Sequence, residues 1–261
     1  MVIALTIVFS VLGLIIGSFL NVVILRLNTQ KSLGGRSACM SCQKTLCWYE
    51  LIPFFSFIAL RGRCKTCKTK ISIQYPLVEI AAGFVFGLLF WKFQNIFFDQ
   101  TISFSLVYGY YAILFSLLIA IVTYDIKHKI IPDVLSFVFG LISFLGIFIF
   151  DGYVFYPHIP TFLELLSGII IAVPFALLWL FSKGEWMGLG DAKLMLGMGF
   201  MLGLEKALSS LVIAFWSGAI FGVLFMVINK KNLKTEIPFA PFLALGTLLA
   251  FFLDIFIFRI F

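Results

Sequence analysis

Two aspartates in an otherwise apolar sequence have the side chain and the setting for acid–base chemistry. Asp125 lies in TYDIKHKIIPD and Asp191 in GLGDAKLM, and both segments adjoin long hydrophobic runs. A carboxylate within or near hydrocarbon is costly, so an acid in such a place is a candidate for function. Two carboxylates that meet away from water share a proton, and one can then activate water while the other polarises a carbonyl. This is the chemistry by which an aspartate pair hydrolyses a peptide bond.

Small and basic residues surround Asp191. Gly188 and Gly190 lack a Cβ, so we expect the backbone there to bend and a substrate strand to come close. Lys193 would lie roughly 200° around the helix from Asp191. We therefore expect Lys193 to reach the membrane interface rather than to pair with Asp191.

Four cysteines predict a metal site. They form two C-x-x-C pairs that are separated by 21 residues, namely Cys39 and Cys42, then Cys64 and Cys67. Each pair offers two thiolates from one turn, which predicts a tetrahedral zinc site with no open position for water. Two disulfides are the alternative, and a cytoplasmic setting disfavours them. Segment 26–76 has too little core to fold unaided, so we expect zinc to supply much of its folding free energy.

The composition excludes the soluble classes. Of the 261 residues 62% are hydrophobic and 12% are charged, which is typical of a polytopic membrane protein. Long apolar runs without alternation favour helices over a barrel. We therefore predict an all-α membrane protein with a small zinc-stapled cytoplasmic insertion and eight spans: 2–25, 77–97, 104–124, 134–150, 163–181, 191–204, 207–228 and 237–258.

The distribution of Lys and Arg predicts the orientation. If segment 26–76 is cytoplasmic, only Lys92, Lys206 and Arg259 fall outside, which favours both termini outside. The sixteen on the cytoplasmic side are Arg26, Lys31, Arg36, Lys44, Arg61, Arg63, Lys65, Lys68, Lys70, Lys127, Lys129, Lys183, Lys193, Lys230, Lys231 and Lys234. The net charge of +7 is then explained by topology and by anionic lipid headgroups, without any nucleic acid.

Helix direction places both aspartates at one face. Asp125 ends the inward third span and Asp191 begins the outward sixth, so both fall near the cytoplasmic side. From Asp191 to Glu205 a helix rises about 20 Å, whereas the hydrocarbon core is about 30 Å thick. If Glu205 marks the outer boundary, Asp191 is recessed in the membrane.

Plainer interpretations remain open for several acids. Asp125 could equally be the first polar residue of a loop. Asp191 and Asp133 could each be the N-cap of a helix, and for Asp133 we favour this interpretation. The helix dipole accounts for Glu79 and Glu164 as first-turn acids. Gly13 and Gly17, at GxxxG spacing, are expected to serve helix packing. Cys47 lies outside both cysteine pairs and is expected to be a buried or free thiol. The sequence offers no explanation for Asp254.

Several motifs together resemble the type IV prepilin peptidase family. They are GSFLNVVILRL, the paired cysteines, WYELIPFFSFIALRGRC, YPLVE, DIKHKIIPD and GLGDAK, in the order of the family and over nearly the whole chain. Met40 stands where family members often have Pro after the first cysteine, which predicts a less rigid turn. Small size and WYELIP favour a competence-type enzyme of a Gram-positive bacterium.

The resemblance implies a bifunctional enzyme at the cytoplasmic face of the cell membrane. Asp125 and Asp191 would be the catalytic pair of a GxGD-type intramembrane protease that cuts prepilins or pseudopilins after the Gly ending their short basic leader. The cysteine segment would support N-methylation of the new N-terminus with S-adenosylmethionine, with Asn21 and Glu79 as candidate cofactor-binding residues.

Three parts follow from this interpretation. Residues 1–25 form the first span, 26–76 the cysteine domain and 77–261 a seven-helix peptidase domain. Membrane lipid is an expected partner, and the sequence leaves the oligomeric state open. The alternative from another class is a proton- or ion-coupled transporter with a metal-binding loop, which would show broken helices near the middle of the bilayer and an internal repeat.

Overall fold

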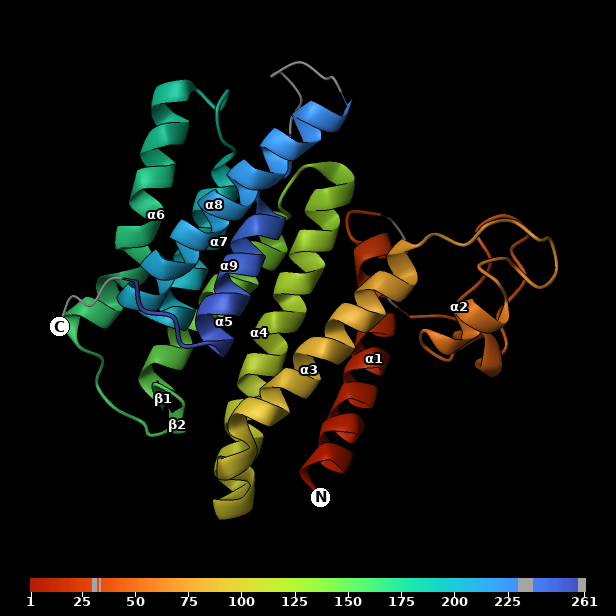
Figure 1. Ribbon diagram of the computed structural model, residues 1–261, viewed down its shortest axis with the longest axis horizontal. Coiled ribbons are helices and arrows are strands. Elements are labelled where there is room, and N and C mark those ends of the chain that lie inside the picture. Colours follow the sequence, from red (N-terminus) through yellow and green to blue (C-terminus); the bar gives the residue numbers. More distant parts are fainter. Residues whose placement is uncertain (30–31, 33, 230–236, 258–261) are drawn as a thin grey trace. The chain divides into compact units, whose positions relative to one another are not determined.

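The computed structural model describes residues 1–29, 32, 34–229 and 237–257, and within them the chain is predominantly helical (Figure 1). The helices are α1 (Val2–Arg26), α2 (Phe55–Ala59), α3 (Gln74–Asp99), α4 (Thr101–His128), α5 (Asp133–Ile149), α6 (Phe162–Ser182), α7 (Leu189–Leu202), α8 (Leu204–Asn229) and α9 (Ala240–Phe252), with the 3-10 helix η1 (Trp48–Leu51). Strands β1 (Phe150–Asp151) and β2 (Val154–Phe155) pair antiparallel in a short hairpin.

Each of the eight predicted spans overlaps one of these helices. Five helices, namely α1, α3, α4, α6 and α8, are long and apolar enough to cross a membrane. The apolar helices α5 and α9 are shorter, and α7 has 14 residues. The chain is therefore a multi-pass helical membrane protein, and the count of eight spans stays a prediction.

Some predicted bounds were wrong. The third predicted span ended at residue 124, whereas α4 continues to His128. The eighth was predicted to run to residue 258, whereas α9 ends at Phe252, followed by Leu253 as C-cap and by Asp254 in the left-handed region at φ 48°. The sequence also gave no indication of η1, α2 or the hairpin. Among the predicted topology signals, Lys31, Lys230, Lys231, Lys234, Arg259 and position 258 lie outside the described residues.

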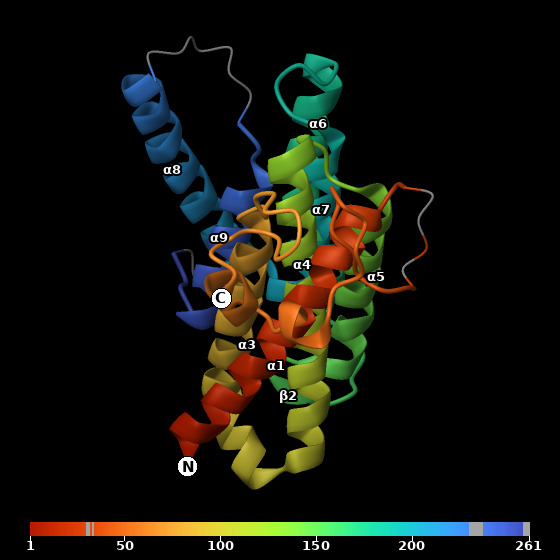
Figure 2. The ribbon, with the colours of Figure 1, turned by 90° about the vertical axis from the view of Figure 1, so that its right-hand side faces the viewer.

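The chain divides into two compact units, and the first comprises Met1–Phe104 with Tyr111–Thr123. Its helices α1 and α3 lie side by side in both views (Figures 1 and 2). A Cβ on Gly13 would lie 2.5 Å from the Ala82 carbonyl oxygen, and one on Gly17 would lie 2.7 Å from the Glu79 Cα. These two glycines therefore serve helix packing, as their spacing predicted.

The second unit comprises Ser105–Tyr110 and the described residues from Tyr124 onward. Within it α7 packs against α5 and α6. The helices approach closely because Gly199 faces Gly168, and the Ser167 hydroxyl donates to the Gly199 carbonyl at 3.1 Å. Gly197 in turn makes room for the Phe139 ring. Small residues on α7 thus fix the helix that carries Asp191.

A cluster of polar side chains joins separate segments of the second unit. Lys206 Nζ donates to Asp254 Oδ1 at 2.6 Å and to the Tyr153 hydroxyl, which itself donates to Asp254 at 3.0 Å. Burial raises the pKa of Tyr153, which keeps the phenol neutral and able to donate. The cluster gives Asp254, which the sequence left unexplained, a clear structural partner.

Candidate active site and metal site

The two candidate catalytic aspartates lie on different helices of the same unit. Asp125 is in the last turn of α4 and is 5% exposed, while Asp191 is in the first turn of α7 and is partly exposed. The Asp125 carboxylate acts electrostatically on that of Asp191. Two acids far apart in sequence are thus brought close enough to repel each other when both are ionised.

Backbone groups hold both carboxylates. Asp125 accepts a hydrogen bond from the backbone N–H of Ala240, at the start of α9, and Asp191 accepts one from Gly188. The plainer interpretations of these acids were wrong in detail. Asp125 is inside α4 rather than in a loop, and the N-cap of α7 is Gly188, with Asp191 three residues later.

The glycines before Asp191 differ in what they provide. Neither Gly188 nor Gly190 is among the glycines with positive φ, so their backbone conformation is open to other residues. A Cβ on Gly190 would lie 2.8 Å from the Cβ of Ile131, whereas one on Gly188 would meet only ordinary contacts, the nearest at 3.8 Å with Asp191 Oδ2. Gly190 therefore lets the segment after Asp125 pack against the start of α7.

The charged neighbours of the pair are engaged with each other. Lys193 Nζ donates to Asp133 Oδ1 at 2.6 Å, and both side chains are exposed. Asp133 is the first residue of α5, whose N-cap is Pro132, so the predicted N-cap role of Asp133 was wrong. The nearby cation Lys193 is thus directed to Asp133 and not to Asp191.

The four predicted metal ligands come together. The Sγ atoms of Cys39, Cys42, Cys64 and Cys67 all lie within 4.8 Å of one another, and Cys39 and Cys67 are 3.7 Å apart. Four thiolates about 2.3 Å from a tetrahedral ion are spaced by about 3.8 Å, so the cluster has the dimensions of a metal site. All five cysteines are described and are free thiols, which contradicts the disulfide alternative.

The two cysteine pairs adopt the same turn. In the first, the N–H of Cys39 donates to the Lys44 carbonyl and Gln43 donates back to the Cys39 carbonyl; in the second, Cys64 and Lys68 repeat this with Thr69. Gln43 and Lys68 both have positive φ, at 56° and 60°. The first turn, which contains Met40, therefore has the same backbone hydrogen bonds as the second turn. Each turn presents two sulfurs on one side.

The second turn also prepares a thiolate. The hydroxyl and backbone N–H of Thr69 hydrogen bond to Cys67 and lower the pKa of that thiol to about 6. A cysteine of this kind is a thiolate at neutral pH, which is the form that binds metal. Cys47, outside the cluster, is instead the N-cap of η1, and its N–H donates to the buried Glu50 carboxylate at 2.8 Å.

The candidate cofactor residues are Asn21 in α1 and Glu79 in α3. Asn21 is 2% exposed, and its Nδ2 donates to the Tyr75 carbonyl at 3.1 Å, while its Oδ1 has no hydrogen-bond partner among the described residues. Glu79 is 7% exposed and accepts the Phe54 N–H at 2.7 Å. The first-turn interpretation of Glu79 was wrong, because α3 begins five residues earlier, at Gln74. That of Glu164 is confirmed by its capping box with Thr161.

Sequence reasoning missed three contributors to these sites. The Ala240 backbone, Ile131 beside Gly190 and the Phe54 backbone beside Glu79 act through main-chain groups or shape. Of these three residues only Phe54 has an unusual backbone conformation, with a φ of 60° that bulky residues rarely adopt. No residue type or spacing would have identified the other two.

The fold and the candidate sites define the class: a multi-pass helical membrane protein with two interacting carboxylates and a separate cluster of four cysteines. Residues 11–93 match the family described as Bacterial Peptidase A24 N-terminal domain, and residues 112–223 match the Type IV leader peptidase family. No solved structure is detectably similar.

Three relatives share the name prepilin leader peptidase/N-methyltransferase. That of Stutzerimonas stutzeri is 31% identical over 90% of this chain and 86% of its own length. The Xanthomonas campestris relative is 31% identical over 92% and 88%, and the Myxococcus xanthus relative is 33% identical over 85% and 63%. The chain belongs to the type IV leader peptidase family.

Proposed function

We propose that this protein is a membrane endopeptidase that removes the leader of prepilins or pseudopilins, with Asp125 and Asp191 as its catalytic pair. The observation that carries the proposal is the electrostatic contact between two acids contributed by α4 and α7. One carboxylate takes a proton from water while the other, protonated, polarises the scissile carbonyl. Family membership supports prepilin processing, and nothing in the comparisons favours a transporter.

The backbone donors suit this mechanism. Hydrogen bonds from Ala240 and Gly188 orient the two carboxylates, and the ion pair between Lys193 and Asp133 keeps the nearby ammonium group away from them. A pair that is not neutralised by a cation can hold a single shared proton. Gly188 is the N-cap of α7, and Gly190, packed on Ile131, is in its first turn, so the expectation that both belong to an active-site loop was wrong for Gly190.

The remaining topology is proposed from the charge distribution. The active site lies at the cytoplasmic face of the cell membrane, and the termini are outside. Cleavage after the Gly that ends a short basic leader is proposed from the family resemblance. The three-part division into residues 1–25, 26–76 and 77–261 and the competence-type assignment are retained as proposals from the sequence. The positive-inside rule supports the orientation.

For the cysteine cluster we propose structural zinc. Four sulfur donors within 4.8 Å of one another suit zinc, and four thiolates leave no coordination position for a substrate. The metal would hold together a segment that buries few side chains of its own.

A second activity, N-methylation of the new N-terminus, is proposed from the family name. S-adenosylmethionine, when bound, supplies an electrophilic methyl group and carries an ammonium and a sulfonium charge. The unpartnered Oδ1 of Asn21 and the buried carboxylate of Glu79 are acceptors that fit a cationic group of this kind. Their roles would be to bind and orient it.

The test is cleavage of a pseudopilin by enzyme reconstituted in lipid vesicles. We expect Asp125→Asn and Asp191→Asn each to lower the rate by roughly 10²-fold or more. The matched control is Asp151→Asn, which removes an exposed acid of β1 in the same unit and is expected to retain cleavage. Normal cleavage by either of the first two variants would contradict the pair, and failure of the wild type on every pseudopilin would contradict the function.

A further inference from the structure

Helices η1 and α2 of the cysteine segment expose large apolar side chains although they lie outside the predicted membrane spans. Trp48 is 78% exposed, Phe55 60% and Ile58 56%. Phe55, Ile58 and Ala59 follow helical spacing, so they share one face of α2. A contiguous apolar face of this kind normally marks an interaction surface.

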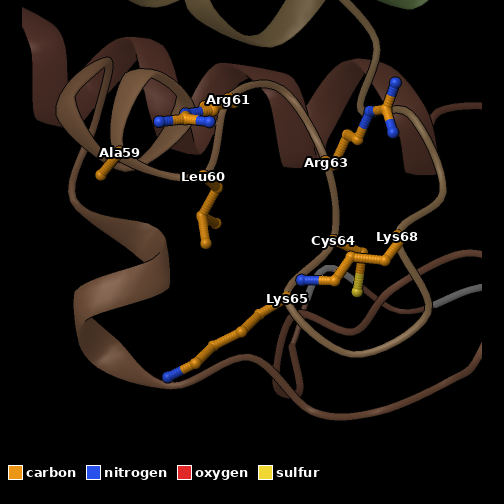
Figure 3. A pocket seen from close by; sticks show the side chains of 7 residues that line it. All are labelled: Ala59, Leu60, Arg61, Arg63, Cys64, Lys65 and Lys68. Atoms are coloured by element: carbon orange, nitrogen blue, oxygen red, sulfur yellow. The ribbon is translucent and has the colours of Figure 1, made fainter.

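A basic pocket adjoins this face. Its volume is about 540 Å³ and it is lined by Ala59, Leu60, Arg61, Arg63, Cys64, Lys65 and Lys68. In Figure 3 the Lys68 side chain lies beside Cys64, the Lys65 side chain extends away from them, and the side chains of Arg61 and Arg63 lie apart from each other. Glu50 is the sole acid in the sequence from 26 to 76. Its carboxylate is buried and accepts a hydrogen bond from the backbone N–H of Cys47. Glu50 acts electrostatically on Lys65, but none of the residues that line the pocket is acidic.

Contacts make the aromatic and basic groups one surface. Lys65 Nζ lies 5.0 Å above the Tyr49 ring and 3.3 Å from its hydroxyl, and the Tyr49 ring packs edge to face against Trp48. Ala59, at the end of α2, belongs both to the apolar face and to the pocket. We call residues 48–68 with this face and pocket the docking surface.

The depth of the docking surface relative to the membrane follows from one hydrogen bond. The Phe54 N–H, just before α2, donates to Glu79, which is five residues into the candidate span α3. Five residues of helix rise about 8 Å, so α2 begins beside the end of a membrane helix. This is the level of the headgroup layer, where aromatic side chains are favoured.

We propose that the docking surface binds anionic phospholipid: Trp48, Phe55 and Ile58 enter the boundary between headgroups and acyl chains, and the basic pocket takes a headgroup phosphate. Aromatic and apolar groups on one side with Lys and Arg beside them are the composition of interfacial membrane-binding segments. The charge favours lipid over a prepilin leader, because a basic leader would be repelled by the same cations. The proposal goes beyond the peptidase function and does not depend on it.

The experiment measures hydrogen exchange in peptides from residues 48–60 of the full chain, without substrate. The protein is placed in nanodiscs of phosphatidylcholine alone or of phosphatidylcholine mixed with phosphatidylglycerol. We expect exchange to be slower by about tenfold in the anionic discs, given the contribution of two or more cations near the surface. Equal exchange in the two lipids would overturn the proposal.

Matched variants separate the pocket from charge in general. Arg61→Gln with Lys68→Gln is expected to abolish the lipid dependence, whereas Arg36→Gln with Lys70→Gln, which removes the same charge from the same segment outside the pocket, is expected to keep it. If both double variants lost the lipid dependence equally, the pocket would not be the binding site. Bound metal serves as the measure of intact folding, and the wild-type comparison between lipids tests the proposal without any variant.

Two further additions distinguish other occupants. Inorganic phosphate added to phosphatidylcholine discs should leave exchange unchanged, and protection by phosphate alone would identify a soluble-anion site instead of a lipid site. A pseudopilin added to the same discs should also leave residues 48–60 unchanged. Protection that requires the pseudopilin would assign the surface to substrate and overturn the proposal.

Discussion

The cysteine segment and helix α7 reach a defined structure by opposite means. Among the described residues from 27 to 75, only Glu50 and Cys64 are buried, whereas seven of the 14 residues of α7 are buried, all of them small or apolar. The segment relies on two hydrogen-bonded turns and four thiols, while α7 relies on glycines that admit neighbouring helices. Burial contributes free energy in proportion to apolar area, so the segment must obtain most of its stability elsewhere.

This difference assigns different weaknesses to the two regions. A region held by ligand–metal bonds fails when the metal leaves, and it fails as a whole. A region held by close packing fails when a side chain is made too large for its space. The predictions below break one means of support at a time.

Removing the metal should have the largest effect. We expect a chelator or Cys64→Ser to bring exchange in peptides covering residues 39–70 to the rate of an unfolded chain, because metal binding supplies about 10 kcal/mol in comparable small zinc sites. Peptides from α5 and α7 should keep their protection. Cys47→Ser is the control, since Cys47 lies outside the cluster. A segment that stays protected after complete loss of metal would contradict the comparison.

Crowding the packed region should come next. Gly190→Ala places a Cβ 2.8 Å from that of Ile131, so we expect the start of α7 to shift and kcat/KM for pseudopilin cleavage to fall by about 10- to 100-fold. Gly140→Ala in α5 is the control, because its Cβ would meet no atom within 4 Å. Metal content should be unchanged in both. Similar activities for the two variants would show that the contact with Ile131 does not position Asp191.

The packed unit also contains a charge cluster that tests how much burial adds to an ion pair. Lys206 and Asp254 have side chains 14% and 47% exposed, so we expect Lys206→Met to lower the free energy of unfolding by about 1 to 2 kcal/mol, less than for a fully buried pair. Denaturant unfolding in bicelles, followed with both single variants and the double variant, measures the coupling. Additive effects of Lys206→Met and Asp254→Asn would mean that the cluster contributes no coupling.

The smallest effect is expected at Asp133 and Lys193. Their side chains are 77% and 41% exposed, and exposed ion pairs contribute about 0 to 1 kcal/mol. Lys193→Gln should therefore change the unfolding free energy by less than about 1 kcal/mol, and the difference should vanish at high salt. A loss larger than that at Lys206 would reverse the order proposed for the two pairs.

The sequence predicted what periodicity and residue type encode. Apolar runs predicted a helix in each of the eight segments, and the spacing of the cysteines predicted their clustering, because both signals are local or repeated. The prediction failed at Glu79 and Asp133, because the observed helices begin a few residues away from the predicted bounds. Glu79, expected in a first turn, accepts a hydrogen bond from Phe54, and Asp133, expected as an N-cap, pairs with Lys193. Boundaries depend on packing, which no short window of sequence contains.

The contacts that position the carboxylates were not predictable for a different reason. The Ala240 N–H, like any main-chain group, has no signature in residue type, and the fit of Gly190 to Ile131 depends on how two segments far apart in the chain meet. Asp254 had no interpretation because its partners Lys206 and Tyr153 are distant in sequence. Sequence analysis thus named the candidate reacting groups but not the contacts that hold them.

The hydrogen bond from Ala240 to Asp125 has a consequence for biosynthesis. A ribosome adds residues in order, so Asp125 and Asp191 have both been made before the start of α9 exists. Until α9 joins the unit, Asp125 lacks the donor that orients it. A chain that stops before α9 would therefore lack one of the two backbone donors that hold the proposed catalytic pair.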